Sequence, residues 1–226
     1  GGTDIISRAL TPYVEQNLGK SIILQNRTGA TGAIATQYVY DQSSDGYTLL
    51  YGAENPQLYQ IMGISQLSYD DFEPIILIGR ETAVVVVRSD SKYNTIDELL
   101  QDAKENPDSI KLGTTGPGGL TFVVASLFKS VDDVTFNQIP FDWDGPVVTA
   151  LLGGHVDFTI TKLSAIKELL RNEDVRVISS ISNDYMEGYE NIEPIGKINK
   201  EYAKYLPWGP FYGVYTKKDT PKEVVE

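Results

Sequence analysis

The sequence KLGTTGPGGLTFVVASLF, residues 111–128, decides the fold class of this chain and supplies its first candidate site. It predicts a short strand, a glycine-rich turn and an amphipathic helix. Such a turn lets backbone amides converge at the positive end of a helix, where an anion can bind without any basic side chain. The glycines of this stretch are Gly113, Gly116, Gly118 and Gly119.

The residues of this turn exclude two common nucleotide-binding motifs. A P-loop has Lys and then Ser or Thr after its last glycine, whereas Leu120 and Thr121 follow here. The dinucleotide-binding fingerprint has a third glycine three residues after its second, where this chain has Thr121 after Gly118. The turn is therefore either an anion site or a connector whose glycines only relieve backbone strain.

Strands and helices alternate outward from this stretch, which predicts an α/β fold. Thr3 or Asp4 is expected to cap the first helix, and Asp144 is expected to cap a short helix that ends at residue 152. Thr95 and Glu98 form the pattern of a capping box. Strands are expected at 21–25, 47–52, 82–88, 134–139, 156–161, 175–179 and 208–216, in addition to the short strand that begins at residue 111. Residues 72–79 form a further apolar run, and the segment 182–205 is expected to be irregular.

The order of these elements predicts two α/β lobes. Residues 1–84 with 209–226 form the first lobe, and residues 88–208 form the second. Crossings near 82–88 and 208–214 are expected to act as hinges around a ligand cleft. The β-branched run 82–88 predicts a strand that is covered on both faces.

Composition removes several classes of function. A net charge of -12 argues against nucleic acid or an anionic membrane as a partner. No apolar run approaches the roughly 20 residues that span a bilayer. The chain has no cysteine, and its one histidine, His155, is expected in a surface turn. No metal-binding motif is present, so neither a metal nor a cofactor is expected.

Three further places are candidate ligand contacts. Ala53, Glu54 and Asn55 follow a predicted strand, at the end where open α/β sheets bind ligands. Two like charges about 4 Å apart repel by roughly 1 to 4 kcal/mol, so Glu54 would favour a ligand with an amine or amide. Trp143 either stacks on an apolar part of the ligand or packs partly into the core. Thr161 ends another predicted strand.

An ordered set of short motifs resembles the extracytoplasmic solute receptors of tripartite tricarboxylate transporters, the Bug-type receptors. Each motif is weak alone, but together they cover essentially the whole chain in the right order. The motifs are GGTD at residues 1–4, NRTGATGAI at 26–34, DGYTL at 45–49, the NP pair at 55–56, GTTGPG at 113–118, ALLGGHVD at 150–157 and TPKEVV at 220–225.

The resemblance implies a two-lobed type II periplasmic-binding-protein (Venus flytrap) fold that closes on a small carboxylate and delivers it to a membrane permease. It implies an extracytoplasmic, monomeric receptor, either periplasmic or lipid-anchored. A signal sequence and first strand are expected before Gly1, and a helical segment after Glu226. The resemblance departs from the family at residues 120–122, where a polar run is usual. Carried over to this chain, the ligand contacts are Gly2, Thr3, Asp4, Thr115, Gly116, Pro117, Gly118, Gly119 and Thr121.

Three other functions stay open at this point. An α/β enzyme could use the same cleft, although one histidine and no cysteine or nucleophile elbow make catalysis a poor expectation. A ligand module of a sensor would have the same binding chemistry as a transport receptor. A receptor for an amine- or amide-bearing ligand would follow if Glu54 faces the cleft.

Overall fold

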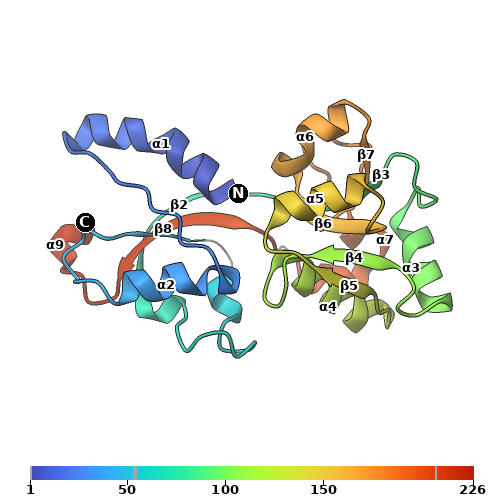
Figure 1. Cartoon of the computed structure of the whole chain (residues 1–226), viewed down its shortest axis with the longest axis horizontal. Coiled ribbons are helices and arrows are strands. Elements are labelled where there is room, and N and C mark those ends of the chain that lie inside the picture. Colours follow the sequence, from blue (N-terminus) through green and yellow to red (C-terminus); the bar gives the residue numbers. More distant parts are fainter. Residues whose placement is uncertain (1, 53–54, 207) are drawn as a thin grey trace. The chain divides into compact units, whose positions relative to one another are not determined.

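The computed structural model describes residues 2–52, 55–206 and 208–226, and the chain divides into two compact units (Figure 1). Unit 1 consists of Gly1–Arg80 with Phe211–Glu226, and unit 2 is Glu81–Pro210. The chain thus passes between units at residues 80–81 and 210–211. The strand expected at 82–88 forms as β3 (Ala83–Arg88), but it lies inside unit 2 and not at the passage between units. That either passage works as a hinge stays a prediction.

Unit 1 is built on an antiparallel sheet with the strand order β1-β8-β2. A small core of Val39, Leu50 and Phe72 packs between this sheet and its helices. The elements of unit 1 are α1 (Gly2–Leu18), η1 (Ala30–Gly32), α2 (Ala33–Tyr40), β1 (Leu50–Gly52), η2 (Asn55–Leu58), η3 (Tyr69–Asp71), β2 (Phe72–Arg80), β8 (Phe211–Lys217) and α9 (Lys222–Val225).

One expectation for unit 1 is wrong. Residues 21–25 form no strand within the described chain, and the Ile23 side chain is 82% exposed. A strand needs a partner for its ladder, and residues 21–25 have none among the described residues. Helix α1 forms as expected, and its apolar residues Ile5 and Leu18 are 68% and 61% exposed.

Two helix starts also differ from expectation. Helix α1 begins at Gly2, so Thr3 and Asp4 lie inside its first turn rather than at the cap. Helix α5 (Asp144–Leu152) has Trp143 at its N-cap position, without a side-chain capping bond. Asp144 instead lies in the first turn, where its negative charge is favourable near the positive end of the helix.

Unit 2 is built on a mixed sheet with the order β5-β4-β6-β3-β7. β4 runs parallel to β5 and β6, while β3 runs antiparallel to β6 and β7. The carboxyl ends of β5, β4 and β6 therefore lie at one edge of the sheet. The strands are β3 (Ala83–Arg88), β4 (Lys111–Thr114), β5 (Asn137–Pro140), β6 (Phe158–Lys162) and β7 (Val175–Ser180).

Helices cover both faces of this sheet (Figure 1). One face packs on α3 (Ile96–Glu105), α4 (Leu120–Asp132), α7 (Ile195–Ile198) and α8 (Lys200–Ala203), and the other packs on α5 and α6 (Leu163–Arg171). β3 is covered on both sides, as its β-branched sequence predicts. Helices α7 and α8 lie in the segment 182–205 that was expected to be irregular, so that expectation is wrong in part.

The capping box at the start of α3 is confirmed. The Thr95 hydroxyl accepts a hydrogen bond from the Glu98 amide at 3.3 Å, and the Glu98 carboxylate accepts one from the Thr95 amide at 3.3 Å. Both hydrogen bonds join residues three apart in the chain, so the amino-acid sequence alone is sufficient to predict this helix start.

Asp102, on α3, should make the stability of unit 2 depend on acid pH. Hydrogen bonds from Lys92, Tyr93 and Asn106 lower its pKa to about 2. Because the unfolded pKa is near 3.9, the stabilisation is complete above that value and is lost as pH falls through about 2. Urea unfolding at pH 6, 4, 3 and 2.5 should show that Asp102→Asn removes this part of the acid dependence, about 1 kcal/mol after solvent screening. An unchanged pH profile would contradict the assignment.

Candidate functional site

The glycine turn follows β4 and leads directly into α4, as the sequence predicts. Gly116 and Gly118 have φ of 87° and 74°, a conformation that side chains other than glycine rarely adopt. At Gly119 a Cβ atom would lie 2.4 Å from the Thr115 hydroxyl oxygen and 3.2 Å from the Gly116 carbonyl oxygen. The sequence of glycines is therefore required by the path of the backbone and by its close approach to itself.

Three amides of the turn are engaged inside it. The Thr115 amide donates to the Thr121 hydroxyl at 3.2 Å, and the Gly116 amide donates to the Thr114 hydroxyl at 3.1 Å. The Gly119 amide donates to the Gly116 carbonyl at 3.2 Å. The expectation that the whole turn offers its amides to an anion is corrected accordingly, because a donor used internally is not available to a ligand.

The Gly118 amide and the first amides of α4 lack such internal acceptors in the described part of the chain. Among the described residues, no acceptor bonds the amides of Gly118, Leu120, Thr121 and Phe122, and the first α4 amide that has one is Val123. The first amides of a helix have no partner within the helix, and they carry its partial positive charge. α4 is 13 residues long and begins at Leu120. These four amides are therefore candidate donors to an anion.

Two buried threonine hydroxyls accept hydrogen bonds from the backbone of the turn. Thr121 and Thr114 are each 2% exposed, and the Thr121 hydroxyl donates to the Thr114 hydroxyl at 2.8 Å. The contact of Thr121 with a ligand stays a prediction, and the partners of its hydroxyl in the structure are Thr114 and the Thr115 amide. Thr114 was missed. The Thr-x-Gly spacing to Gly116 is typical of a side-chain turn and could have identified it.

Two other predicted contacts lie at the carboxyl ends of the two strands that flank β4. Trp143 follows β5, and Thr161 lies in the last part of β6. Trp143 is 59% exposed, so the alternative that it packs partly into the core is wrong. Thr161 is buried, and within the described chain its hydroxyl has no hydrogen-bond partner. β4 lies between β5 and β6, so all three sites of unit 2 share one edge of its sheet.

The first turn of α1 holds the predicted contacts of unit 1. At Gly2 a Cβ atom would lie 2.7 Å from the Tyr212 hydroxyl, so a larger residue would displace the buried Tyr212 ring. Thr3 follows in the same turn. Tyr212 was missed by the sequence analysis, because only the pairing of distant segments brings β8 to the start of α1.

The Asp4 carboxylate is held by two donors. Arg8 Nε donates to both oxygens at 2.9 and 3.0 Å, and Asn26 Nδ2 donates at 2.8 Å. The hydrogen bond from Arg8 is the main cause that lowers the Asp4 pKa, followed by the one from Asn26. The Asp4 carboxylate is thus ionised at neutral pH and is hydrogen-bonded to Arg8 and Asn26. Its contact with a ligand stays a prediction. The i,i+4 spacing of Asp4 and Arg8 on a helix is the sequence pattern that could have predicted this ion pair.

The remaining predicted contacts are residues 53–55 and Pro117. Ala53 and Glu54 lie outside the described residues. Asn55 begins the short helix η2 (Asn55–Leu58). Pro117 lies between Gly116 and Gly118 and is exposed.

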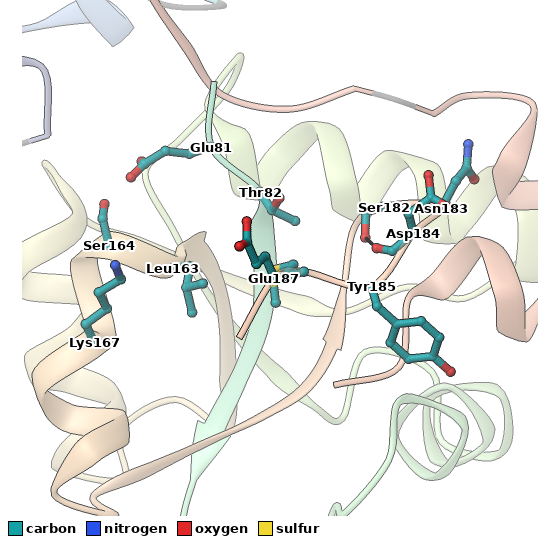
Figure 2. Close-up of a pocket in the computed structure, with 11 residues that line it drawn as sticks. Glu81, Thr82, Leu163, Ser164, Lys167, Ser182, Asn183, Asp184, Tyr185 and Glu187 are labelled. Atoms are coloured by element: carbon teal, nitrogen blue, oxygen red, sulfur yellow. Dashed lines mark hydrogen bonds between the residues drawn. The ribbon is translucent and has the colours of Figure 1, made fainter. Parts of the chain in front are cut away.

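A separate cavity of about 460 Å³ lies in unit 2 where β6 and β7 end (Figure 2). Lys167 and Ser164 project into it from the first turns of α6, and the Tyr185 ring points away from them. Its walls carry three carboxylates, those of Glu81, Asp184 and Glu187, against one ammonium group. This excess of negative charge would repel a carboxylate, so the glycine turn fits an anionic ligand better than the cavity does.

The described residues contain no group of three or more His, Cys, Asp or Glu side chains placed to hold a metal ion. No helix among them is both long enough and apolar enough to span a bilayer. His155 is exposed in the turn after α5, as expected.

Comparison with known proteins identifies relatives along the whole chain. Protein BugT of Bordetella pertussis is 26% identical over 231 residues, which is 100% of this chain and 69% of BugT. The solved periplasmic binding protein BugD is 25% identical with a TM-score of 0.87, and the match covers 100% of this chain and 75% of BugD. The R. palustris protein Rpa4515, solved with adipate, is 25% identical with a TM-score of 0.86 and the same coverage.

These likenesses confirm the expected type II periplasmic-binding-protein fold. The model of the family described as tripartite tricarboxylate transporter family receptor matches residues 6–226. The resemblance drawn from the motifs is confirmed by a match of this extent. The chain belongs to the tripartite tricarboxylate transporter receptor family.

Proposed function

We propose that this protein is an extracytoplasmic receptor that binds one carboxylate of a small organic acid at the glycine turn of unit 2. The available amides of Gly118, Leu120, Thr121 and Phe122 supply the donors to the carboxylate oxygens, and the positive end of α4 adds its partial charge. The observation that carries the proposal is the division of amides at this turn. Those of Thr115, Gly116 and Gly119 are engaged internally, and four others between residues 118 and 122 have no acceptor among the described residues.

The chemistry of the edge around the turn fits such a ligand. The unpartnered Thr161 hydroxyl can donate to an anion, and the exposed Trp143 ring can cover an apolar carbon chain. A relative that is 25% identical was solved with adipate, a molecule with two carboxylates and an apolar chain. Gly2, Thr3 and Asp4 of unit 1 are kept in the proposal as contacts predicted from the resemblance.

The biological role follows from the family. We propose that the receptor is a monomer outside the cytoplasm and that it delivers its ligand to a permease of a tripartite transporter. A sensor module would bind in the same way. An enzyme would also need a reactive group at the turn, and amides and hydroxyls alone provide binding without an evident nucleophile or base.

Calorimetry tests the proposal against a panel of adipate, malate, acetate, putrescine and an uncharged amide. We expect one molecule of adipate or malate to bind per chain, with a Kd of about 1 μM or lower and no conversion of the ligand. Acetate, with one carboxylate and no chain, should bind at least about tenfold more weakly.

Each contrary result has a definite meaning. Binding of putrescine or the amide in preference to the acids would contradict an anion site and support the amine receptor. Formation of a product, followed by NMR of the ligand, would contradict the non-catalytic assignment. Absence of binding by every acid would refute the proposed function.

A further inference from the structure

The two buried hydroxyls beneath the glycine turn form a small network with its backbone. Thr121 Oγ1 donates to Thr114 Oγ1 at 2.8 Å and accepts the Thr115 amide at 3.2 Å. Thr114 Oγ1 also accepts the Gly116 amide at 3.1 Å. Two hydroxyls seven residues apart thus tie the end of β4, the turn and the first turn of α4 together.

We infer that Thr114 and Thr121 are positioning residues for the ligand site, which select the amides that the turn offers to a carboxylate. The inference rests on the proposed function and extends it. The two side chains need not touch the ligand. They bind the amides of Thr115 and Gly116, so that the carboxylate meets the remaining amides between Gly118 and Phe122.

The physical reason is competition between donors. A free glycine turn can point different amides toward an anion, because glycine has little preference between positive and negative φ. Each additional arrangement that must be abandoned on binding lowers the affinity. Internal acceptors for Thr115 and Gly116 remove those arrangements before the ligand arrives. Both hydroxyls are almost completely buried, so water competes little for these bonds.

Thr121 also explains a departure from the family pattern. Residues 120–122 are Leu, Thr and Phe, where a polar run is usual in the resemblance, and Leu120 is buried in the core of unit 2. In this chain the single hydroxyl of that run hydrogen-bonds the Thr115 amide and the Thr114 hydroxyl. The bond network therefore assigns a task to the one polar side chain that the run retains.

Thr121→Val is the central variant, because valine has nearly the same shape and lacks the hydroxyl. We expect adipate to bind about 10-fold to 100-fold more weakly, since the Thr115 amide loses its acceptor and the turn loses its fixed arrangement. Thr121→Ser keeps the hydroxyl and should restore binding to within about threefold of the original affinity.

A matched control is available in unit 1. Thr216 and Thr220 form a buried hydroxyl pair at 2.8 Å, and Thr216 is also 2% exposed. Thr216→Val removes the same kind of bond away from the glycine turn. Its thermal stability should fall by an amount similar to that of Thr121→Val, while its affinity for adipate should stay within about twofold.

The experiment combines calorimetry with hydrogen exchange of individual amides, measured by NMR without ligand. In Thr121→Val the Thr115 amide should exchange at least about tenfold faster, and the serine variant should restore its protection. Unchanged exchange, or unchanged affinity in a protein whose original form binds adipate, would overturn the inference alone. Loss of affinity in Thr216→Val equal to that in Thr121→Val would also overturn it. Absence of acid binding by the original protein would instead refute the proposed function, and the exchange measurement would still decide whether the hydroxyls order the turn.

Discussion

Gly118→Val should abolish detectable binding of adipate while unit 2 stays folded. Gly118 is buried in the turn and has a φ of 74°, so valine would be strained there by about 1 to 2 kcal/mol and would place a branched side chain beside the proposed donors. Calorimetry measures the loss of binding, and circular dichroism with thermal unfolding measures the fold. We expect a loss of affinity of at least about 100-fold, because both donor geometry and access are changed.

Gly116→Ala is the control for backbone strain. Gly116 has a φ of 87°, yet a Cβ atom built on it has no other atom within 4 Å among those described. Its amide is already engaged by Thr114 and is not one of the proposed donors. Alanine should therefore cost about 1 to 2 kcal/mol of stability while it leaves binding within about tenfold. Adipate binding by Gly118→Val as tight as that of the original protein would show that the turn is a connector.

Phe128→Ala should produce the largest loss of stability, about 3 to 5 kcal/mol in unit 2. Phe128 is fully buried on α4, and its ring makes edge contacts with the Phe136 and Tyr202 rings, each at 6.0 Å between centroids. Removal of the ring leaves a cavity between α4 and α8 that rigid neighbours fill only partly. Because α4 carries the free amides at its start, the affinity for adipate should fall as well.

Tryptophan fluorescence during urea unfolding measures this change in the right part of the chain. Trp143 and Trp208, the two tryptophans of the sequence, both lie in unit 2. Leu152→Ala is a suitable control, since this α5 side chain is 39% exposed and should cost less than about 1 kcal/mol. A loss of under 1 kcal/mol in Phe128→Ala would contradict the role of the aromatic cluster as the anchor of α4.

The parts of the fold that could be predicted are those whose causes are local. The capping box of Thr95 and Glu98 needs only neighbouring residues, and the strand 83–88 follows from a run of β-branched side chains. The strand at 21–25 could not be predicted correctly in the same way. Its residues favour a strand, but a strand forms only when a neighbouring strand hydrogen-bonds to it.

In the candidate site, too, the features with local causes could be predicted from the sequence and those that depend on distant residues could not. The glycines indicated a backbone that needs positive φ and close approach, and the structure has both at residues 116–119. Which amides remain available depended on the Thr114 hydroxyl, whose role the motif did not reveal. The exposure of Trp143 likewise depended on what packs around it.

The amino-acid sequence alone was sufficient for the α/β class, for the family and for the location of an amide-rich turn before α4, because periodicity, glycine placement and ordered motifs are properties of the chain itself. Only the folded arrangement assigned each donor to an acceptor. A hydrogen bond depends on where two groups lie in space, and residues 114 and 121 meet because β4 and α4 fold back beside the turn that joins them.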